Sequence, residues 1–380
     1  MKYRHFPKIP QVSISALGLG MMRLPTIGGD PSRIDEAAAE ATFLAALEGG
    51  VNYVDTAYPY HNGQSELFTG KVIEKHGKRD SLYLATKCPV WLVQGEGDWD
   101  RLLNEQLKKL RTDHIDFYLL HALNDERWDT ILKYHGIEAM ERAKKDGRIR
   151  HLGFSFHAPL PAFKRIINGY QGWEFCQVQY NYLDTEYQAG LEGIRYAAER
   201  NIGVIVMEGL RGGALAKVPP PVEKIFNRSS FKRSPVEWAL RFVLDRPETV
   251  TVLSGMGAVE QVKENVRIAD EVDALSLGVD EKKAFDEAAA FFRKKMPVPC
   301  TACGYCTPCP NGVAIPEVFS IYNSAVAFDT KHDLGWYKKG YVAEHKGADS
   351  CIACGECLPK CPQGIDIINS LAEAHRYLTA

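Results

Sequence analysis

The stretch G-G-V-N-Y-V-D-T-A-Y-P-Y-H-N-G-Q-S-E, from Gly49 to Glu66, is typical of a short buried strand that ends in a carboxylate. The apolar run V-N-Y-V-D closes on Asp55, and Tyr60 follows on the loop beyond it. In a parallel α/β protein, catalytic side chains gather at the carboxyl ends of the strands. We therefore expect Asp55 and Tyr60 to lie at such an edge.

Two later strand ends carry polar side chains in the same way. The run L-Y-L-A-T-K closes on Lys87, and I-D-F-Y-L-L-H closes on His121. Taken singly, the four residues have ordinary explanations: a loop aromatic, a turn carboxylate, a surface lysine and a satisfied buried histidine. Together at one barrel edge they indicate an active site.

The motifs D-T-A-x-x-Y, T-K and L-L-H, in this order and spacing, resemble the catalytic tetrad of the aldo/keto reductases over about residues 5 to 275. Hydride addition to a carbonyl builds negative charge on oxygen, so a proton donor must lie beside it, and Tyr60 is the candidate. Because a phenol ordinarily titrates near pH ~10, we expect Lys87 to make it ionise more readily. Asp55 would hold Lys87, and His121 would orient the carbonyl as a neutral imidazole.

Predicted strands and helices alternate along most of the chain. Eight strand-helix units within about 250 residues favour an α/β (β/α)8 TIM barrel over an open doubly wound sheet. We also expect one helix over 130–146, and a long irregular connection over 209–231 that is either a substrate loop or an inert insertion. The expected strands are 15–25, 51–55, 81–87, 114–121, 149–155, 175–180, 203–207 and 249–253.

The composition limits the class of protein. The formal net charge of −2 gives no reason to expect nucleic acid or an anionic membrane as a partner. No apolar run approaches the roughly 18 residues of a membrane helix, and the N-terminus lacks the apolar core of a signal peptide, so we expect a cytoplasmic protein. Eight of the ten cysteines fall in two C-terminal groups, leaving Cys88 and Cys176. Clustered cysteines in a reducing compartment indicate metal ligands.

The resemblance implies a nicotinamide cofactor, NADP or NAD, held without a Rossmann unit. The sequence G-L-G-M-M-R lacks the third glycine of a dinucleotide fingerprint. At the nicotinamide end the resemblance points to Ser155 and Gln177, with Met207 where the family usually stacks an aromatic ring. At the adenosine end it points to six residues: Ser254, Gly255, Met256, Gln261, Glu264 and Asn265.

The cofactor motifs depart from the family pattern. Phe156 follows Ser155 where an amide side chain is usual, and Gly255 and Gln261 stand where Lys and Arg are common. Because a 2′-phosphate favours cationic partners, these departures leave the choice between NADP and NAD open. Arg267 and Lys263, on the same predicted helix, are candidate substitutes.

The character of the chain changes after residue 285, and we expect a barrel over 1–285 and a small, mostly α-helical ferredoxin-like iron-sulfur domain over 286–380. The second cysteine run, C-x2-C-x2-C-x3-C-P, has the bacterial ferredoxin spacing for [4Fe-4S] clusters. In two-cluster ferredoxins the fourth cysteine of each run ligates the other cluster. The ligands of one cluster would then be Cys300, Cys303, Cys306 and Cys361. Those of the other would be Cys351, Cys354, Cys357 and Cys309.

The first cysteine run is one residue shorter, C-x2-C-x2-C-x2-C-P, which leaves open whether the chain binds two clusters or one. Two zinc ribbons are the alternative, although zinc needs only C-x2-C pairs. The third cysteine and the Cys-Pro ending favour iron-sulfur.

Three hypotheses for function follow. In the first, the barrel acts on a small carbonyl or alcohol while the clusters exchange electrons with a ferredoxin or flavoprotein partner. In the second, the chain is an NAD(P)-dependent carbonyl reductase whose clusters are structural or redox-sensing. In the third, the barrel has lost NAD(P) binding and the chain is an electron-transfer protein. A flavin usually converts between hydride and single-electron transfer, and the sequence shows no flavin motif. Trp91 and the segment around Arg211 are candidate pocket walls. Substrate identity and oligomeric state cannot be read from the sequence.

Overall fold

The computed structural model describes residues 1–228, 231–300, 302, 304–330, 332–361 and 363–380. The chain divides into two compact units. The barrel unit comprises Met1–Asn181, Ala189–Leu215 and Val236–Leu277, and the C-terminal unit comprises Tyr182–Gln188, Ala216–Pro235 and Gly278–Ala380. The predicted domain division after residue 285 falls within a helix of the C-terminal unit and stays a proposal.

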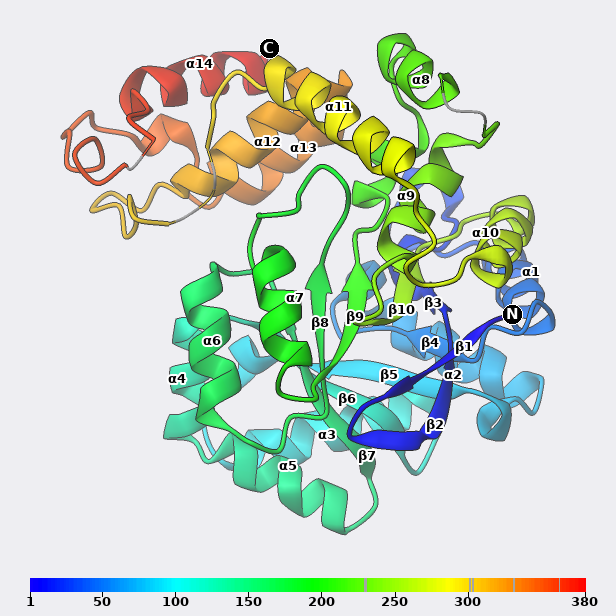
Figure 1. Cartoon of the computed structure of the whole chain (residues 1–380). Coiled ribbons are helices and arrows are strands. Elements are labelled where there is room, and N and C mark those ends of the chain that lie inside the picture. The colour runs from blue at the N-terminus through cyan, green and yellow to red at the C-terminus, as the bar shows by residue number, and fades with distance from the viewer. Residues whose placement is uncertain (229–230, 301, 303, 331, 362) are drawn as a thin grey trace. The chain divides into compact units, whose positions relative to one another are not determined.

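The barrel unit is a closed barrel of parallel strands in the order β10-β3-β4-β5-β6-β7-β8-β9 (Figure 1). The predicted (β/α)8 fold is confirmed. Branched and aromatic side chains fill both faces of the strands, as expected where helices cover a parallel sheet. The strands are β3 (Leu17–Gly20), β4 (Tyr53–Asp55), β5 (Tyr83–Cys88), β6 (Ile115–Leu123), β7 (Ile149–Phe156), β8 (Phe175–Gln179), β9 (Gly203–Met207) and β10 (Thr249–Ser254).

Helices surround this barrel, and the single helix predicted over 130–146 is wrong. The chain forms α4 and α5 there, separated at His135, which has a positive φ of 50°. Gly136 packs so closely that a Cβ would lie 2.6 Å from Trp99. The helices are α1 (Glu36–Glu48), α2 (Gln64–Lys75), α3 (Gly97–Leu110), α4 (Asp125–Lys133), α5 (Gly136–Lys145), α6 (Leu160–Gly169), α7 (Gly190–Ala198), α9 (Pro235–Leu244) and α10 (Val259–Glu271).

An antiparallel hairpin that the sequence did not indicate precedes the barrel. It consists of β1 (Tyr3–Phe6) and β2 (Ile9–Ser15). Phe6 packs on Phe117 and Phe175 of the barrel interior, with ring centroids 5.2 and 5.9 Å apart. Figure 1 shows the hairpin at the amino ends of the strands, so the carboxyl ends remain available for the site.

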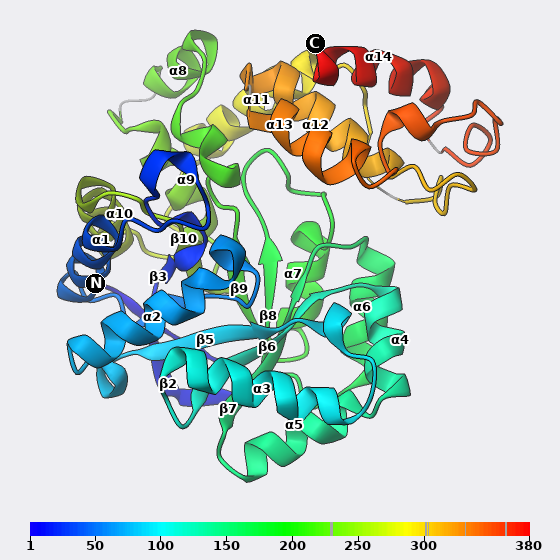
Figure 2. The same cartoon turned by 180° about the vertical axis from the view of Figure 1, so that it is seen from behind.

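The C-terminal unit is helical, with α8 (Pro220–Asn227), α11 (Val279–Lys295), α12 (Ile315–Phe328), α13 (His332–Tyr337) and α14 (Ile367–Thr379) (Figure 2). Its core lies mainly between α12 and α14 and includes Phe319 and Leu371. The expectation of irregular chain over 209–231 is wrong. Prolines at its first turn start α8, and Phe226 on that helix packs on Phe285 of α11, with ring centroids 6.0 Å apart.

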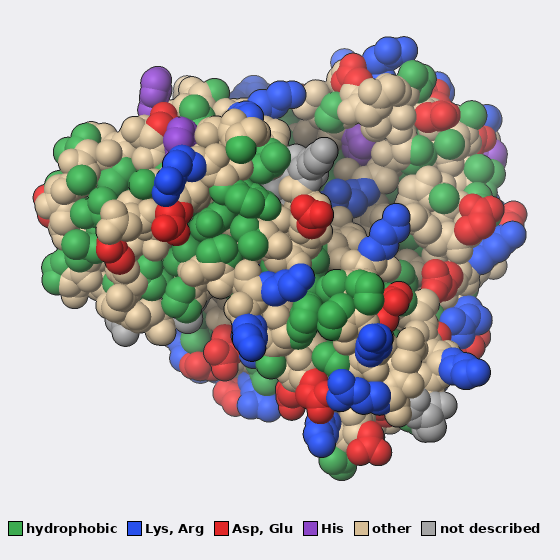
Figure 3. Space-filling view, turned by 90° about the horizontal axis from the view of Figure 1, so that it is seen from above, with side chains coloured by type: hydrophobic (Ala, Val, Ile, Leu, Met, Phe, Trp, Pro, Cys, Tyr) green, Lys and Arg blue, Asp and Glu red, His purple; other side chains and the backbone are tan. Residues whose placement is uncertain are grey.

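The surface agrees with the near-zero net charge. On the face seen in Figure 3, positive and negative side chains are interspersed among hydrophobic ones. Within the described ranges, no helix has both the length and the apolar composition needed to span a bilayer.

Candidate active site

The four predicted catalytic residues lie together at the carboxyl edge of the barrel. Asp55 ends β4, Lys87 lies near the end of β5, and His121 lies near the end of β6. Lys87 Nζ donates to Asp55 Oδ1 at 2.6 Å and to the Thr56 carbonyl at 2.8 Å, and it lies 3.3 Å from Tyr60 OH. The ends of β4 and β5 thus bring Asp55, Tyr60 and Lys87 into one hydrogen-bonded group, although Lys87 is distant from the other two in sequence.

The loop that carries Tyr60 is held by its neighbour. His61 is buried and has a positive φ of 53°. Its Nε2 accepts a hydrogen bond from the Leu24 N–H, so its Nδ1–H donates to the Pro31 carbonyl. Two backbone contacts from the chain after β3 therefore fix the turn that aims Tyr60 at Lys87.

Burial sets the electrostatics of this group. Asp55 is 2 % exposed and Lys87 is 1 % exposed. Burial raises the pKa of Asp55, and Lys87 opposes part of that rise. Burial alone would lower the pKa of Lys87, but Asp55 and Tyr60 raise it above its usual value. Lys87 is therefore an ammonium ion at neutral pH.

The expectation that Lys87 makes Tyr60 ionise more readily needs a correction. The ammonium does act to lower the pKa of Tyr60, but burial raises that pKa by more, and Asp55 adds to the rise. The phenol is therefore held in its protonated form.

His121 lies beside Tyr60, with ring centroids 6.3 Å apart. Burial, followed by the charge of Lys87, lowers the pKa of His121 well below its usual value, so the imidazole is neutral at pH 7. The ring centroid of Trp91 lies 5.1 Å from that of His121, and Trp91 is 41 % exposed. Trp91 therefore forms a wall beside the imidazole. Arg211, the other predicted wall, begins the 3-10 turn Arg211–Ala216 after β9.

The residues predicted to hold nicotinamide lie on adjacent strands. Ser155 on β7 is the register partner of Gln177 on β8, and Ser155 Oγ accepts from the Ala122 N–H at 2.8 Å. Gln177 Nε2 lies 3.5 Å from Met207 Sδ. Gln177 Oε1 is buried and has no hydrogen-bond partner among the described residues. An unsatisfied amide oxygen fits the recognition of a carboxamide.

The predicted adenosine-end residues surround the start of α10. Asn265 Nδ2 donates to Ser254 Oγ at 3.0 Å, and the Gly257 N–H donates to Gln261 Oε1 at 2.9 Å. Met256 is buried, whereas Glu264 is partly exposed.

The two candidate cations on α10 differ in availability. Arg267 is paired with Glu237 and Glu271, which occupy its guanidinium. Lys263 is exposed and makes no ion pair within the described ranges.

Sequence reasoning missed two groups of residues. A buried network lies behind Lys87: Gln106 Nε2 donates to Glu66 Oε1 at 2.5 Å and to the Lys87 carbonyl at 3.0 Å. Arg23, at the end of G-L-G-M-M-R, covers Gly255. Helical and strand periodicity signal neither group, because both arise from contacts distant in sequence.

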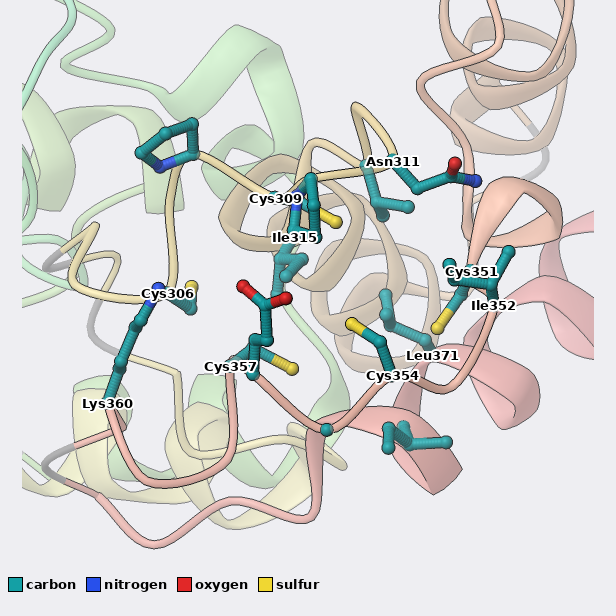
Figure 4. A pocket seen from close by; sticks show the side chains of 16 residues that line it. Cys306, Cys309, Asn311, Ile315, Cys351, Ile352, Cys354, Cys357, Lys360 and Leu371 are labelled. Atoms are coloured by element: carbon teal, nitrogen blue, oxygen red, sulfur yellow. The ribbon is translucent and has the colours of Figure 1, made fainter.

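The cysteines of the C-terminal unit surround two hollows. The first is lined by cysteines of both runs: Cys306, Cys309, Cys351, Cys354 and Cys357. Figure 4 shows thiols from both cysteine runs around it. Burial raises the pKa of Cys357, and its neighbours Cys351, Cys354 and Cys309 add to the rise.

The second hollow is lined by Cys300, Cys306 and Cys361 together with apolar side chains such as Phe319. Cys303 lies outside the described residues. Within those described, no three Cys, His, Asp or Glu side chains are gathered tightly enough to hold a single metal ion. The other walls of both hollows are largely apolar.

Comparison with protein families agrees with this division. The model of the aldo/keto reductase family matches residues 16–276, more than half of the chain. The model of a 4Fe-4S dicluster domain matches residues 299–365.

Two curated relatives match this chain over most of their length. L-galactose dehydrogenase of Arabidopsis thaliana is 27% identical, covering 71% of this chain and 88% of the relative. The NADH-specific methylglyoxal reductase of Escherichia coli K12 is 25% identical, covering 68% of this chain and 92% of the relative.

Solved structures share the barrel. The holo form of an aldo-keto reductase from Bacillus halodurans is 27% identical with a TM-score of 0.61, covering 76% of this chain and 96% of that one. An aldo-keto reductase from Klebsiella pneumoniae in complex with NADPH is 23% identical, also with a TM-score of 0.61, and covers 75% of this chain and 94% of that one. The chain therefore belongs to the aldo/keto reductase family and is an NAD(P)-dependent oxidoreductase with a C-terminal 4Fe-4S dicluster domain.

Proposed function

We propose that the barrel unit interconverts a small carbonyl compound and its alcohol, with Tyr60 as the general acid and base. The observation that carries the proposal is the buried chain of contacts from Asp55 through Lys87 to Tyr60 OH, at 2.6 and 3.3 Å. Such a chain places a proton donor beside a fixed positive charge, which is what a developing alkoxide requires.

Each residue has a distinct part in the reduction. A bound reduced nicotinamide supplies the hydride, and Tyr60 gives its proton to the carbonyl oxygen. The raised pKa of Tyr60 keeps that proton in place at neutral pH. Lys87 stabilises the negative charge that remains, and Asp55 holds the ammonium. His121, neutral because its pKa is lowered, presents an N–H to the carbonyl oxygen.

The third hypothesis, a barrel without NAD(P) binding, is not favoured. Its motivation was the departures at Phe156, Gly255 and Gln261. Phe156 packs in the core against Phe163 rather than toward a ligand, with ring centroids 5.0 Å apart. The unsatisfied amide oxygen of Gln177 supports a carboxamide-binding role.

For the C-terminal unit we propose two [4Fe-4S] clusters with crossed ligation. The set Cys309, Cys351, Cys354 and Cys357 is supported by the shared lining of the first hollow, which Cys306 also lines. Since Cys306 alone lines the second hollow as well, we assign it to the other cluster. Cys300, Cys306 and Cys361 line the second hollow, and Cys303 would complete that set. Bound clusters transfer single electrons. Exchange with an external ferredoxin or flavoprotein is the role we test first.

A specific observation favours a second, structural role for the clusters. Segments that follow β8 and β9 belong to the C-terminal unit. Tyr182 packs on Phe226 and Phe285, with ring centroids 5.9 and 5.6 Å apart, and Arg293 donates to the Leu183 carbonyl at 3.3 Å. Loss of the clusters would therefore disturb chain that continues directly from barrel strands.

One experiment tests whether clusters are bound and whether they exchange electrons with the barrel site. The protein is purified anaerobically, its iron, sulfide and zinc are measured, and its spectrum is recorded before and after NADH, NADPH or dithionite. About eight irons per chain are expected for two clusters. Bleaching of the cluster absorbance by NADH or NADPH supports electron exchange with the barrel through a group, such as a flavin, that converts hydride transfer to single-electron transfer. Bleaching by dithionite alone favours a separate redox partner or a structural role. Zinc in place of iron contradicts the cluster assignment.

Variants complete the test. Cys354→Ser removes an exposed thiol of the first hollow and should reduce the iron content by about half. Glu356→Gln, in the same loop, is the control and should keep all the iron. Cofactor-linked turnover that persists in folded Cys354→Ser protein contradicts electron exchange through this cluster.

A further inference from the structure

We propose that Arg127 and Trp91 form a subsite for a carboxylate, so that the barrel acts on short oxo carboxylic acids. The inference rests on the proposed function, since it names the class of carbonyl compound that Tyr60 would reduce. The subsite differs from the place of the reacting carbonyl oxygen, which the proposed function puts at Tyr60 and His121.

The first argument is where the Arg127 side chain lies. Arg127 is in the first turn of α4, shortly after the end of β6. Its Nη1 donates to the carbonyl of Ala122, the residue after His121, at 2.5 Å. Its Cζ lies 5.1 Å from the centroid of the Trp91 ring, which lies 5.1 Å from that of His121. One tryptophan ring therefore has the guanidinium and the imidazole as neighbours.

The backbone next to the guanidinium is held from two sides. Ala122 has a positive φ of 51°, which is uncommon for a residue with a side chain. Its N–H donates to Ser155 Oγ at 2.8 Å, and its carbonyl accepts from Arg127. A guanidinium has five N–H donors, so this contact fixes its direction and leaves donors for a ligand.

The second argument is that the charge of Arg127 is not compensated. Among the residues that the structure describes, Arg127 forms no ion pair, and the exposed Glu126 beside it lies beyond ion-pair distance. Burial lowers the pKa of Arg127, and Glu126 opposes part of that fall. Lys87, by contrast, is paired with Asp55 at 2.6 Å. The guanidinium is thus a partly desolvated cation, and an anion gains more from such a cation than from one in water.

The third argument is a histidine that lies near the same guanidinium. His157 directly follows β7, and its side chain is open to solvent. Enough protein surrounds it that desolvation, followed by the charges of Lys87 and Arg127, lowers its pKa to about 4. Its own charge would in turn lower the pKa of His121. His157 is therefore a neutral imidazole among these groups and can donate one hydrogen bond to a carboxylate.

The number of charges favours a carboxylate over a phosphate. One uncompensated guanidinium balances one negative charge, and its planar fork matches the two oxygens of a carboxylate. A phosphate monoester carries about −1.5 to −2 charges at neutral pH, of which Arg127 would leave a part unbalanced. Because Arg127 and His121 are neighbours of the same Trp91 ring, the carboxylate and the carbonyl must be joined by a short chain.

The test uses anaerobically purified full-length protein with NADH and NADPH. The substrates are 2-oxoethanoate, 4-oxobutanoate and 5-oxopentanoate, each compared with its methyl ester, which keeps the carbonyl and lacks the charge. For at least one acid, kcat/KM should exceed that of the ester by about 10- to 100-fold, the range expected for a charged hydrogen-bonding partner. Glyceraldehyde 3-phosphate should be reduced less efficiently than this acid, and the reverse order overturns the choice of a carboxylate.

Variants connect the preference to Arg127. Arg127→Gln should lower kcat/KM for the preferred acid by about 10- to 100-fold, mainly through KM, and leave the ester unchanged. Arg127→Lys should lose less, because it keeps the charge without the fork. His157→Phe should lower the value for the acid by a smaller factor than Arg127→Gln. Lys133→Gln, which removes an exposed cation from the last turn of the same helix, is the control and should keep the preference.

The outcomes separate this subsite from a structural role of Arg127. An equal fall for acid and ester in Arg127→Gln would mean that the side chain only supports the backbone at Ala122, and it overturns the inference. Reduction of acids and esters with equal efficiency by the parent also overturns it, while the proposed function stands. Unchanged iron content and circular dichroism show that the variants are folded.

Calorimetry decides the inference even where the proposed function fails. If the parent reduces no carbonyl compound, titration with butanoate and butanamide measures the subsite alone. The parent should bind butanoate more tightly than butanamide, and Arg127→Gln should weaken only butanoate. Equal binding of the two compounds by the parent, or no effect of Arg127→Gln, overturns the inference.

Discussion

The barrel mouth and the cysteine runs hold their functional side chains by different means. In the barrel, Asp55, Lys87 and His121 are at most 8 % exposed. A buried hydrogen bond joins Lys87 to Asp55, and His121 lies beside the Tyr60 ring. In the C-terminal unit, Cys354 is exposed and Cys357 is partly buried, and both lie on loops around a hollow. The barrel site is organised by the fold that surrounds it, whereas the proposed clusters would hold the two cysteine loops together.

The difference has an energetic origin. The barrel has a large core, and it can bear the cost of desolvating an ion pair because the partners compensate each other. The C-terminal unit has a smaller core between α12 and α14. Small metal-binding domains gain much of their folding free energy from the bound group. The two sites should therefore respond differently to ligand removal and to mutation.

Removal of iron should have the largest effect. Structural metal sites contribute on the order of 10 kcal/mol to folding, so chelation should unfold the segment that contains the cysteine runs. Limited proteolysis and mass spectrometry should find new cleavage within 299–365 and protection of the barrel strands. Unchanged protection of the cysteine segment after complete iron loss would show that this unit, like the barrel, is organised without its ligand.

Replacement of Tyr60 by Phe tests the barrel directly. The loss of a general acid should lower kcat by roughly 10²- to 10⁴-fold, while cofactor affinity and iron content stay the same. Tyr58→Phe is a matched control on the same loop, because its hydroxyl donates to Glu105 at 3.0 Å, away from the Lys87 contacts. Steady-state kinetics with a small aldehyde checks the prediction, and equal loss in the two variants would exclude a specific role for Tyr60.

Replacement of Lys87 by Met tests whether the barrel site costs stability. The change leaves the buried Asp55 carboxylate unpaired, so the free energy of unfolding should fall by about 3–5 kcal/mol. Urea denaturation measures the effect. The double variant with Asp55→Asn should recover part of the stability, because no uncompensated charge remains. Absence of recovery would mean that the pair does not behave as a coupled buried unit.

The pH dependence of the barrel should show the smallest effect. The pKa of His121 is lowered well below its ordinary value near ~6.5, so its imidazole should stay neutral as the pH falls from 8 to 5.5. The profile of kcat/KM should therefore lack an inflection near pH 6.5 from this residue. As the pH falls below about 6.5, His121 takes up a proton in the unfolded chain but not in the folded protein. The contribution of His121 to the free energy of unfolding should therefore decrease as the pH falls. A loss of activity centred near pH 6.5 that His121→Asn abolishes would contradict the lowered pKa.

Local sequence patterns were enough to predict much of the fold and the positions of the four site residues. The strand from Gly203 to Met207 was predicted with the same bounds that it has in the structure, because a run of apolar branched residues between turns has few alternatives. Motif spacing located Asp55, Tyr60, Lys87 and His121, which the barrel brings together. The helix break at His135 was missed because it depends on Gly136 packing against Trp99 from another helix.

The sequence by itself determined the barrel class, the residues at the strand ends and the cysteine spacing, since all three are set by short-range order along the chain. Tertiary structure alone decided that burial outweighs Lys87 in setting the pKa of Tyr60. It also brought Arg23 over Gly255 and packed α8 on α11. The physical reason is that desolvation and close packing depend on which distant residues surround a group, and no local pattern contains that information.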